Sequence, residues 1–165
     1  MLELHPDFIC IKTDLKNCYN EQSKRSVVDV LRDTEDLSHM TTFAAAVLSP
    51  ESSLESQGKV IGTASEGLVQ GDPASGAFQA IGLQPSLVRL DHECSRGGGM
   101  ARGAADDIYA VGPKDVVIPA VEQFSAEIKT RCGLDLQWTK SQLYCKEGDL
   151  PEICQTDSKS SNWVD

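Results

Sequence analysis

The stretch Gly103-Ala-Ala-Asp-Asp-Ile-Tyr-Ala-Val-Gly112 decides the fold that the sequence predicts. Small or β-prone residues flank the two adjacent aspartates on both sides, at positions 100–105 and 108–111. That pattern predicts a β-hairpin with Asp106 and Asp107 at its tip, so that two carboxylates share one exposed turn. Adjacent aspartates are also common on solvated surfaces, so the pair alone does not indicate a function.

A third acidic position follows a short apolar run near the start of the chain. Residues 8–13, Phe-Ile-Cys-Ile-Lys-Thr, are rich in β-branched and aromatic side chains, which predicts a buried strand that delivers Asp14 at its end. Magnesium prefers hard oxygen ligands, and carboxylates from two facing strands can supply them. Asp14, Asp106 and Asp107 therefore form a candidate magnesium site, although a strand-end aspartate is also a common turn former.

The composition bounds the class of protein. With 165 residues, 40% of them hydrophobic, the chain has room for one soluble domain with a sizeable core. No apolar run is long enough to cross a bilayer, and the N-terminus lacks the layout of a signal peptide. Six scattered cysteines without zinc-ligand spacing favour free intracellular thiols. The net charge of −10, taken alone, argues against a nucleic-acid partner.

Hydrophobic periodicity places the remaining elements. Helices are expected over residues 24–33 and 35–48, from Asp72-Pro73 onward with a kink or an interruption at Pro85, and through 117–128 with Gly133 as the C-cap residue. Strands are expected over residues 59–64, 134–138 and 143–145, and plain connectors over 51–58 and 97–99. Because strands and helices mix without strict alternation, the predicted fold class is α+β, an antiparallel-rich sheet with helices packed on one face.

Four segments also occur in an order that matches the motifs of a known family. They are Asp14-Leu-Lys-Asn-Cys-Tyr-Asn20, Gly67-Leu-Val-Gln-Gly-Asp-Pro73, Ala104-Ala-Asp-Asp107 and Gly133-Leu-Asp-Leu-Gln-Trp-Thr-Lys140. In this order the stretch from Phe8 to Tyr144 resembles a reverse transcriptase of the non-LTR retrotransposon type. That family carries Asp-x-x-Asn-Ala-Phe-Asn, then Gln-Gly-Asp-Pro, then aromatic-x-Asp-Asp, then Gly-Leu followed closely by Lys. Ala104 departs from the pattern, because the family has an aromatic residue there.

The resemblance implies a fold and an activity. Residues 1–146 would form a palm-like subdomain of an incomplete polymerase, without fingers or thumb, and 147–165 a polar, mobile tail. The implied activity is RNA-directed DNA polymerisation, in which two Mg²⁺ ions, or Mn²⁺ in their place, support transfer of deoxynucleoside triphosphates to a primer 3′-hydroxyl. The implied partners are an RNA template and a DNA primer, without a membrane, in the nucleus or cytoplasm. The alternative is a catalytically inactive retroelement remnant that acts as a binding or interaction domain.

The resemblance also assigns roles to the acidic residues and to one lysine. Asp14 and Asp106 would be the principal metal ligands, with Asp107 beside them in a supporting role. Lys140 matches the position proposed as general acid for the departing pyrophosphate, a role that suits an ammonium with a lowered pKa. A solvated lysine on an edge strand explains Lys140 equally well.

Three further residues would contact the nucleotide or the template. Tyr19 matches the aromatic gate under the incoming sugar, where a ring would clash with a 2′-hydroxyl. A core aromatic that packs after the first strand is the competing interpretation of Tyr19. Gln70 and Gly71 would lie against the template and the incoming nucleotide, where glycine permits close approach of the backbone.

Overall fold

The structure is a computed structural model that describes residues 5–49 and 51–145. The predicted tail, residues 147–165, lies outside these ranges. The chain divides into two compact units. Within the described residues, the sheet unit comprises 5–16, 86–127 and 135–145, and the helical unit comprises 17–49, 51–85 and 128–134.

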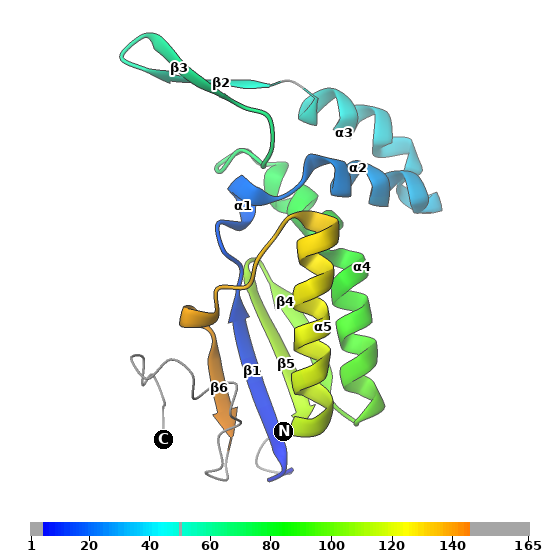
Figure 1. Cartoon of the computed structure of the whole chain (residues 1–165). Coiled ribbons are helices and arrows are strands. Elements are labelled where there is room, and N and C mark those ends of the chain that lie inside the picture. The colour runs from blue at the N-terminus through cyan, green and yellow to red at the C-terminus, as the bar shows by residue number, and fades with distance from the viewer. Residues whose placement is uncertain (1–4, 50, 146–165) are drawn as a thin grey trace. The chain divides into compact units, whose positions relative to one another are not determined.

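The sheet unit is built on four antiparallel strands, in the order β4-β5-β1-β6. Their bounds are β1 Phe8–Asp14, β4 Met100–Ala104, β5 Asp107–Pro113 and β6 Gln142–Cys145. β4 and β5 form the predicted hairpin, but its two-residue turn is Ala105 and Asp106 rather than Asp106 and Asp107, because Asp107 pairs with Ala104 as the first residue of β5. β1 pairs with β5 on one side and with β6 on the other. Two long helices are α4 (Ser75–Arg96) and α5 (Lys114–Cys132), and their residues 86–96 and 114–127, which belong to the sheet unit, run along this sheet in Figure 1. The α+β prediction, with an antiparallel sheet and packed helices, is confirmed.

The two faces of the sheet differ in chemistry because side chains alternate along a strand. In β5, Ile108 and Ala110 are buried, whereas Asp107 and Tyr109, which alternate with them along the strand, are half-buried. Buried residues of α4 and α5 complete the apolar side of this unit: Leu90, Cys94, Val117, Ala120, Val121 and Phe124. The opposite face of the sheet, which we call the open face, therefore carries Lys12 and Asp14 of β1 and Asp107 and Tyr109 of β5.

The helical unit has its own small core. Its elements are α1 (Cys18–Glu21), α2 (Lys24–Asp33), the 3-10 helix η1 (Glu35–Met40), α3 (Thr41–Leu48), the strands β2 (Ser52–Ser56) and β3 (Lys59–Ala64), and the first half of α4. Six buried side chains form the core cluster: Val27, Leu31, Ala44, Leu48, Leu68 and Phe78. The predicted helix over 24–33 and strand over 59–64 are confirmed, whereas the helix expected over 35–48 begins as a 3-10 helix and becomes α-helical at Thr41.

Two other expectations about local structure are wrong. Residues 52–56 form β2, a strand rather than a connector, because Gln57 and Gly58 both adopt left-handed φ angles of 52° and 72°. This two-residue turn folds β2 back onto β3. Pro85 does not interrupt α4, which is continuous from Ser75 to Arg96. Proline removes one hydrogen bond, and the buried side chains of α4 on either side of it outweigh that loss.

The strand expected over 134–138 is also absent. Leu136 forms an isolated β-bridge to Leu15, and Trp138–Lys140 then form the 3-10 helix η2. Gly133 does end α5 with a left-handed φ of 73°, as predicted for a C-cap residue. No helix in the described part of the chain is long and apolar enough to span a membrane.

Cys94 gives the sheet unit an alkaline stability limit. Burial raises the pKa of its thiol from 9.0 to about 11. The folded state therefore keeps the thiol proton after the unfolded chain has lost it, so this contribution is complete below pH 9 and is lost as the pH rises through 11. We expect the free energy of unfolding to fall by on the order of 2 kcal/mol across that window. Urea titrations at both ends of the window would measure the fall, and Cys94→Ala should show a shallower one.

Candidate functional site

The end of β1 and the start of β5 bring two of the predicted carboxylates together. In the antiparallel register Asp14 lies directly opposite Asp107. Side chains of directly opposed residues point to the same face, with Cβ atoms about 5 Å apart. Asp14 and Asp107 therefore share the open face of the sheet, and both are half-buried.

Backbone hydrogen bonds fix the position of Asp14 independently of its side chain. The carbonyl oxygen of Asp14 accepts a bond of 2.8 Å from the N–H of Gln137, and the N–H of Lys16 donates to the carbonyl of Asp135 at 2.9 Å. With the bridge from Leu15 to Leu136, these contacts tie the end of β1 to the segment before η2. The carboxylate thus projects from a well-held strand end, as the apolar run of residues 8–13 predicts.

Asp106 occupies the turn between β4 and β5 and is exposed. The other residue of this two-residue turn, Ala105, has a left-handed φ of 55°, which costs an L-residue about 1 kcal/mol or more. Ala104 pairs with Asp107 across the hairpin and is also exposed. The hairpin therefore presents Asp106 at its tip, next to the opposed pair of Asp14 and Asp107.

The strained turn makes a testable prediction. Replacing Ala105 by Val puts a β-branched side chain at a left-handed φ, so we expect the free energy of unfolding to fall by about 1 to 2 kcal/mol. Ala105→Gly, which removes the strain but frees the unfolded chain, should change it by less than about 1 kcal/mol. Urea unfolding compares the three proteins. Equal stability of the Val and Gly variants would contradict the strain.

Asp107 does not stand alone on the open face, because Lys12 reaches it diagonally across the two strands. The Nζ atom of Lys12 lies 2.9 Å from Oδ2 of Asp107 and 5.7 Å from the centre of the Tyr109 ring. The Tyr109 hydroxyl donates to the same carboxylate oxygen at 3.5 Å. The hydrogen bond to Asp107 raises the pKa of Lys12 above its usual value.

Sequence reasoning assigned no role to Lys12, although a signal was present. Lys12 and Asp14 are two residues apart in a predicted strand, and the two-residue period of a strand puts them on one face. A lysine on the same face as a candidate metal-binding aspartate indicates either an ion pair or a competing cation. The structure shows the ion pair, and it is with Asp107.

Lys140 approaches the site from η2. Its Nζ atom lies 3.7 Å from Oδ2 of Asp14, and its side chain is 70% exposed. An ion pair of this length and exposure adds little stability. Because the expected strand is absent, Lys140 sits in a 3-10 turn rather than on an edge strand. Its ammonium group can therefore move toward or away from Asp14 at small cost.

Tyr19, Gln70 and Gly71 belong to the helical unit. Tyr19 is half-buried and packs against the core cluster, as the competing interpretation expects. Gln70 is exposed in the turn before α4. Gly71 is also exposed and has a left-handed φ of 94°, with nothing within 4 Å of the place where a Cβ would stand. Gly71 is thus required by its backbone angle, and the space beside it is open.

Asp72 orders this same turn. Its carboxylate accepts a 2.7 Å hydrogen bond from the N–H of Ala74, and its carbonyl accepts one of 3.1 Å from Ser75, the first residue of α4. The helix therefore begins slightly later than Asp72-Pro73 predicts. The aspartate still stabilises the approach to the helix by binding backbone N–H groups.

The donor chemistry of Asp14, Asp106 and Asp107 fits a hard divalent cation, since all three supply carboxylate oxygens at one edge of the sheet. Their present arrangement is not that of a closed site. No group of three or more Asp, Glu, His or Cys side chains in the described ranges converges closely enough to hold a metal ion. Magnesium often uses only one or two carboxylates together with substrate phosphates, which an open edge of this kind permits.

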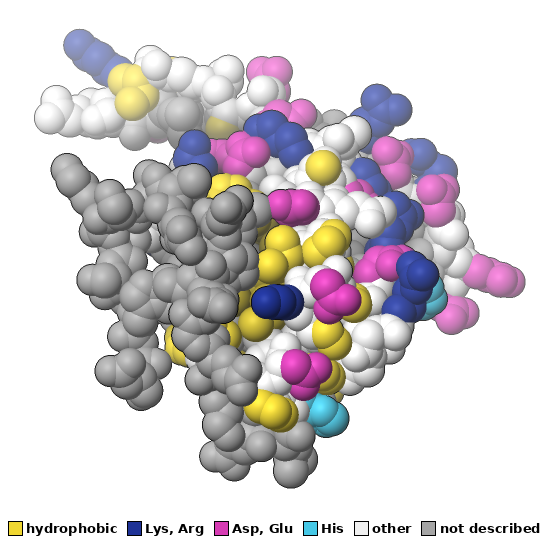
Figure 2. Space-filling model, turned by 60° about the horizontal axis from the view of Figure 1, so that its bottom comes forward, with side chains coloured by type: hydrophobic (Ala, Val, Ile, Leu, Met, Phe, Trp, Pro, Cys, Tyr) yellow, Lys and Arg dark blue, Asp and Glu magenta, His cyan; other side chains and the backbone are white. Residues whose placement is uncertain are grey.

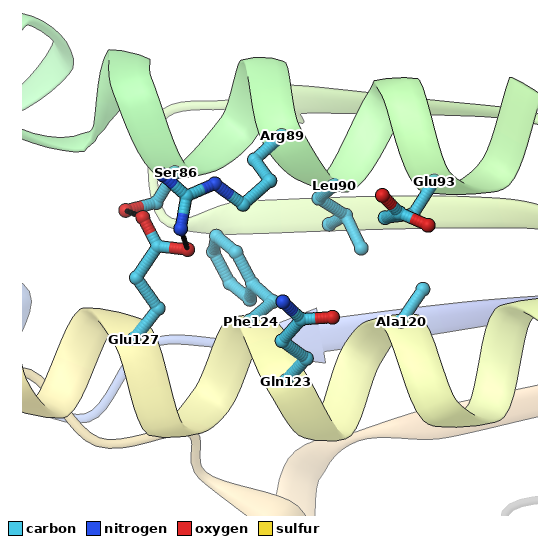
Figure 3. A pocket seen from close by; sticks show the side chains of 8 residues that line it. All are labelled: Ser86, Arg89, Leu90, Glu93, Ala120, Gln123, Phe124 and Glu127. Atoms are coloured by element: carbon cyan, nitrogen blue, oxygen red, sulfur yellow. Dashed lines mark hydrogen bonds and ion pairs between the residues drawn. The ribbon is translucent and has the colours of Figure 1, made fainter.

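A shallow groove lies elsewhere on the sheet unit, between α4 and α5 (Figure 3). Three of its polar side chains engage one another, because Glu127 accepts a hydrogen bond from the Ser86 hydroxyl and pairs with Arg89, each at 2.9 Å. Leu90 and Phe124 cover the apolar part of its lining. Its other carboxylate, Glu93, pairs with Arg96 at 2.9 Å. The sheet edge that carries Asp14, Asp106 and Asp107 therefore remains the candidate site.

Charge on the described surface is mixed. Figure 2 shows Lys and Arg side chains beside Asp and Glu side chains on the face that it presents, without a continuous basic strip. Among the described residues several charges pair locally, as Arg32 does with Asp29 and Arg96 with Glu93, each at 2.9 Å. The surface therefore agrees with the net charge of −10 and offers no broad phosphate-binding patch on that face.

Comparison with known proteins identifies the fold. No protein-family model and no curated protein matches the sequence. Among solved structures, the apo telomerase of Candida tropicalis matches with a TM-score of 0.68 and 14% identity, over 86% of this chain and 29% of that chain. Telomerase of Candida albicans, solved with the TWJ fragment of telomeric RNA, matches with a TM-score of 0.61 and 15% identity, over 91% of this chain and 29% of that one.

These matches show the fold of the chain. Telomerase is a reverse transcriptase, so the chain has a reverse-transcriptase-like fold. At 14% to 15% identity the likeness concerns the fold alone. The chain spans less than a third of the length of these telomerases.

Proposed function

We propose that the chain is the palm portion of an RNA-directed DNA polymerase of the non-LTR retrotransposon type. One observation carries the proposal. The strand that ends in Asp14 pairs with the strand that begins at Asp107, which brings the first and third sequence motifs to the same edge of one sheet. The reverse-transcriptase-like fold supports it, and the order of the four motifs supports the retrotransposon type.

In this proposal Asp14 and Asp106 are the principal ligands of Mg²⁺, which Mn²⁺ could replace. When bound, two such ions activate the primer 3′-hydroxyl and neutralise the charge of the departing pyrophosphate. Asp107 has a supporting role, which agrees with its engagement by Lys12 at 2.9 Å. Asp106 is exposed in its turn and so remains accessible to a substrate.

The chain's other residues would bind and orient the substrates. Lys140, 3.7 Å from Asp14, would give a proton from its ammonium group to the pyrophosphate. Tyr19 would hold its ring against the sugar of the incoming deoxynucleoside triphosphate, and packing against the core cluster would keep that ring rigid. Gln70 and Gly71, both exposed, would contact the template and the incoming nucleotide. The proposed partners are an RNA template and a DNA primer.

Primer extension tests the proposal. The chain would be given an RNA template, a DNA primer, deoxynucleoside triphosphates and Mg²⁺ or Mn²⁺, beside a variant with both Asp106→Asn and Asp107→Asn. We expect weak incorporation by the unaltered chain and at least about 100-fold less by the variant, because misplaced or missing catalytic groups cost that much. Equal incorporation by the two proteins would refute the assigned carboxylates.

A catalytically inactive remnant that acts as a binding or interaction domain is the second candidate. Ala104, exposed where the motif has an aromatic residue, favours it, as does the absence of a closed three-carboxylate group in the described ranges. Such a remnant would keep the fold without polymerising. It would give no incorporation with either protein.

A further inference from the structure

The ion pair between Lys12 and Asp107 lies at the edge of the sheet that carries Asp14, Asp106 and Asp107, which we call the carboxylate edge. Lys12 pairs in register with Tyr109, and Asp14 with Asp107, so the lysine reaches its partner along the diagonal of two adjacent pairs. Both side chains are about one-third exposed, at 29% and 32%. The ammonium is held from two sides, by the carboxylate at 2.9 Å and by the Tyr109 ring at 5.7 Å. This is a better-held pair than that of Lys140 with Asp14, which is longer and more exposed.

The register creates an electrostatic problem that this pair relieves. Like charges directly opposite each other on neighbouring strands destabilise a sheet, and Asp14 faces Asp107 in that way. Asp106 in the adjacent turn adds a third negative charge. A cation fixed beside Asp107 compensates part of this repulsion while no metal ion is bound. The ends of β1 and β5 can therefore pair in the absence of a bound ligand.

The same contact limits what Asp107 can do for a metal ion. Its Oδ2 atom accepts from both the Lys12 ammonium and the Tyr109 hydroxyl, so this oxygen is already engaged. An ammonium at this place also repels a divalent cation that approaches Asp14. Lys12 and a metal ion therefore compete for the negative charge of one sheet edge.

We propose that Lys12 is a positioning residue and the resident counter-cation of the carboxylate edge. Its ion pair holds Asp107 in place at the start of β5. Its charge weakens the binding of divalent cations at Asp14 and Asp106. The inference deepens the proposed function and rests on it for the identity of the cation. Without Lys12, the carboxylate edge keeps its three acidic side chains but loses their nearest compensating charge. Divalent cations then bind more tightly and stabilise the fold more.

Two measurements on Lys12→Met test this role. Mn²⁺ titration followed by electron paramagnetic resonance should show about tenfold tighter binding than the unaltered chain, the change that about 1.4 kcal/mol of removed repulsion produces. The melting temperature without divalent cations should be lower than that of the unaltered chain, and Mn²⁺ should restore it. Lys12→Arg, which keeps the cation, should behave like the unaltered chain in both measurements.

Lys114→Met is the matched control, because it removes the same charge from an exposed position at the start of α5. It should leave Mn²⁺ affinity unchanged. Equal affinity of the unaltered chain and Lys12→Met would overturn the inference and leave the proposed metal site intact. Binding by Lys12→Met alone would support the inference and count against metal-dependent activity of the unaltered chain. Absence of binding by every protein would overturn both.

Discussion

Replacing Gly99 by alanine is expected to destabilise the sheet unit more than any other single change at its glycines. A Cβ at Gly99 would stand 2.0 Å from the carbonyl oxygen of Val111 and 2.8 Å from the Cα of Gly112. Both obstacles are backbone atoms of β5, so no rotation of a side chain can relieve the clash. β4 would have to move away from β5 at the point where their pairing begins.

The cost follows from what must shift. Overfilling a packed side-chain core costs about 1 to 3 kcal/mol, and a clash between two backbones lies at or above the upper end of that range. We expect the free energy of unfolding to fall by about 3 kcal/mol or more, with a loss of about 10 °C in melting temperature. Thermal and urea unfolding monitored by circular dichroism would measure both quantities.

Gly76→Ala provides the opposite control. Gly76 lies in α4, and a Cβ there would meet only the Tyr19 hydroxyl, at an ordinary 3.8 Å. Alanine favours a helix by about 1 kcal/mol over glycine, so this variant should be more stable than the unaltered chain. A Gly99→Ala protein as stable as Gly76→Ala would show that β4 and β5 do not approach as closely as the structure has them.

The close approach of Gly99 to β5 could not be predicted from the sequence. Three glycines in a row after a helix predict a plain connector, and nothing in residues 97–99 indicates which one faces another strand. Only the pairing of β4 with β5 makes Gly99 a point of close approach. By contrast, β1 and the hairpin could be predicted, because a run rich in β-branched and aromatic residues and two β-prone segments around a short turn are local signals. The turn itself was predicted one residue too late, since Asp107 already belongs to β5.

The wrong predictions share a physical cause. The strand expected over 134–138 had the right alternation, but its pairing with β1 amounts to an isolated β-bridge between Leu136 and Leu15, and a strand needs a continuous ladder with its neighbour. β2 had no apolar alternation, and the left-handed turn at Gln57 and Gly58 imposes its pairing instead. Local pattern and tertiary pairing thus decide different elements of the same fold.

The candidate site divides in the same way. Motif spacing selected Asp14, Asp106 and Asp107, because hard ligands at two strand ends are a local signal of metal chemistry. It could not specify that Asp107, rather than Asp106, lies opposite Asp14, since this depends on the register of β1 with β5. Nor could it indicate that Lys12 would reach Asp107, which requires both the register and the length of the lysine side chain.

Replacing Asp14 by asparagine is expected to separate metal binding from stability. Asparagine has nearly the same shape, and the bond from the N–H of Gln137 is to the backbone carbonyl, so the strand end should keep its position. Removing the charge takes away a principal ligand oxygen, and we expect Mn²⁺ affinity to fall by at least about 30-fold, a loss of about 2 kcal/mol. The measurement is the same Mn²⁺ titration by electron paramagnetic resonance.

Stability should move in the other direction. Asp14 faces Asp107 across the strands, so neutralising it relieves like-charge repulsion, while the lost ion pair with the exposed Lys140 contributes little. We therefore expect the metal-free Asp14→Asn protein to melt at the same temperature as the unaltered chain or higher.

Asp115→Asn makes the same chemical change in the first turn of α5, where an acid stabilises the helix N-terminus. It should lower the melting temperature slightly and leave Mn²⁺ binding unchanged. A carboxylate kept at a cost in stability is what a ligand-binding role requires. If Asp14→Asn instead resembled Asp115→Asn in both measurements, Asp14 would be an ordinary strand-end residue and the proposed site would lose its first ligand.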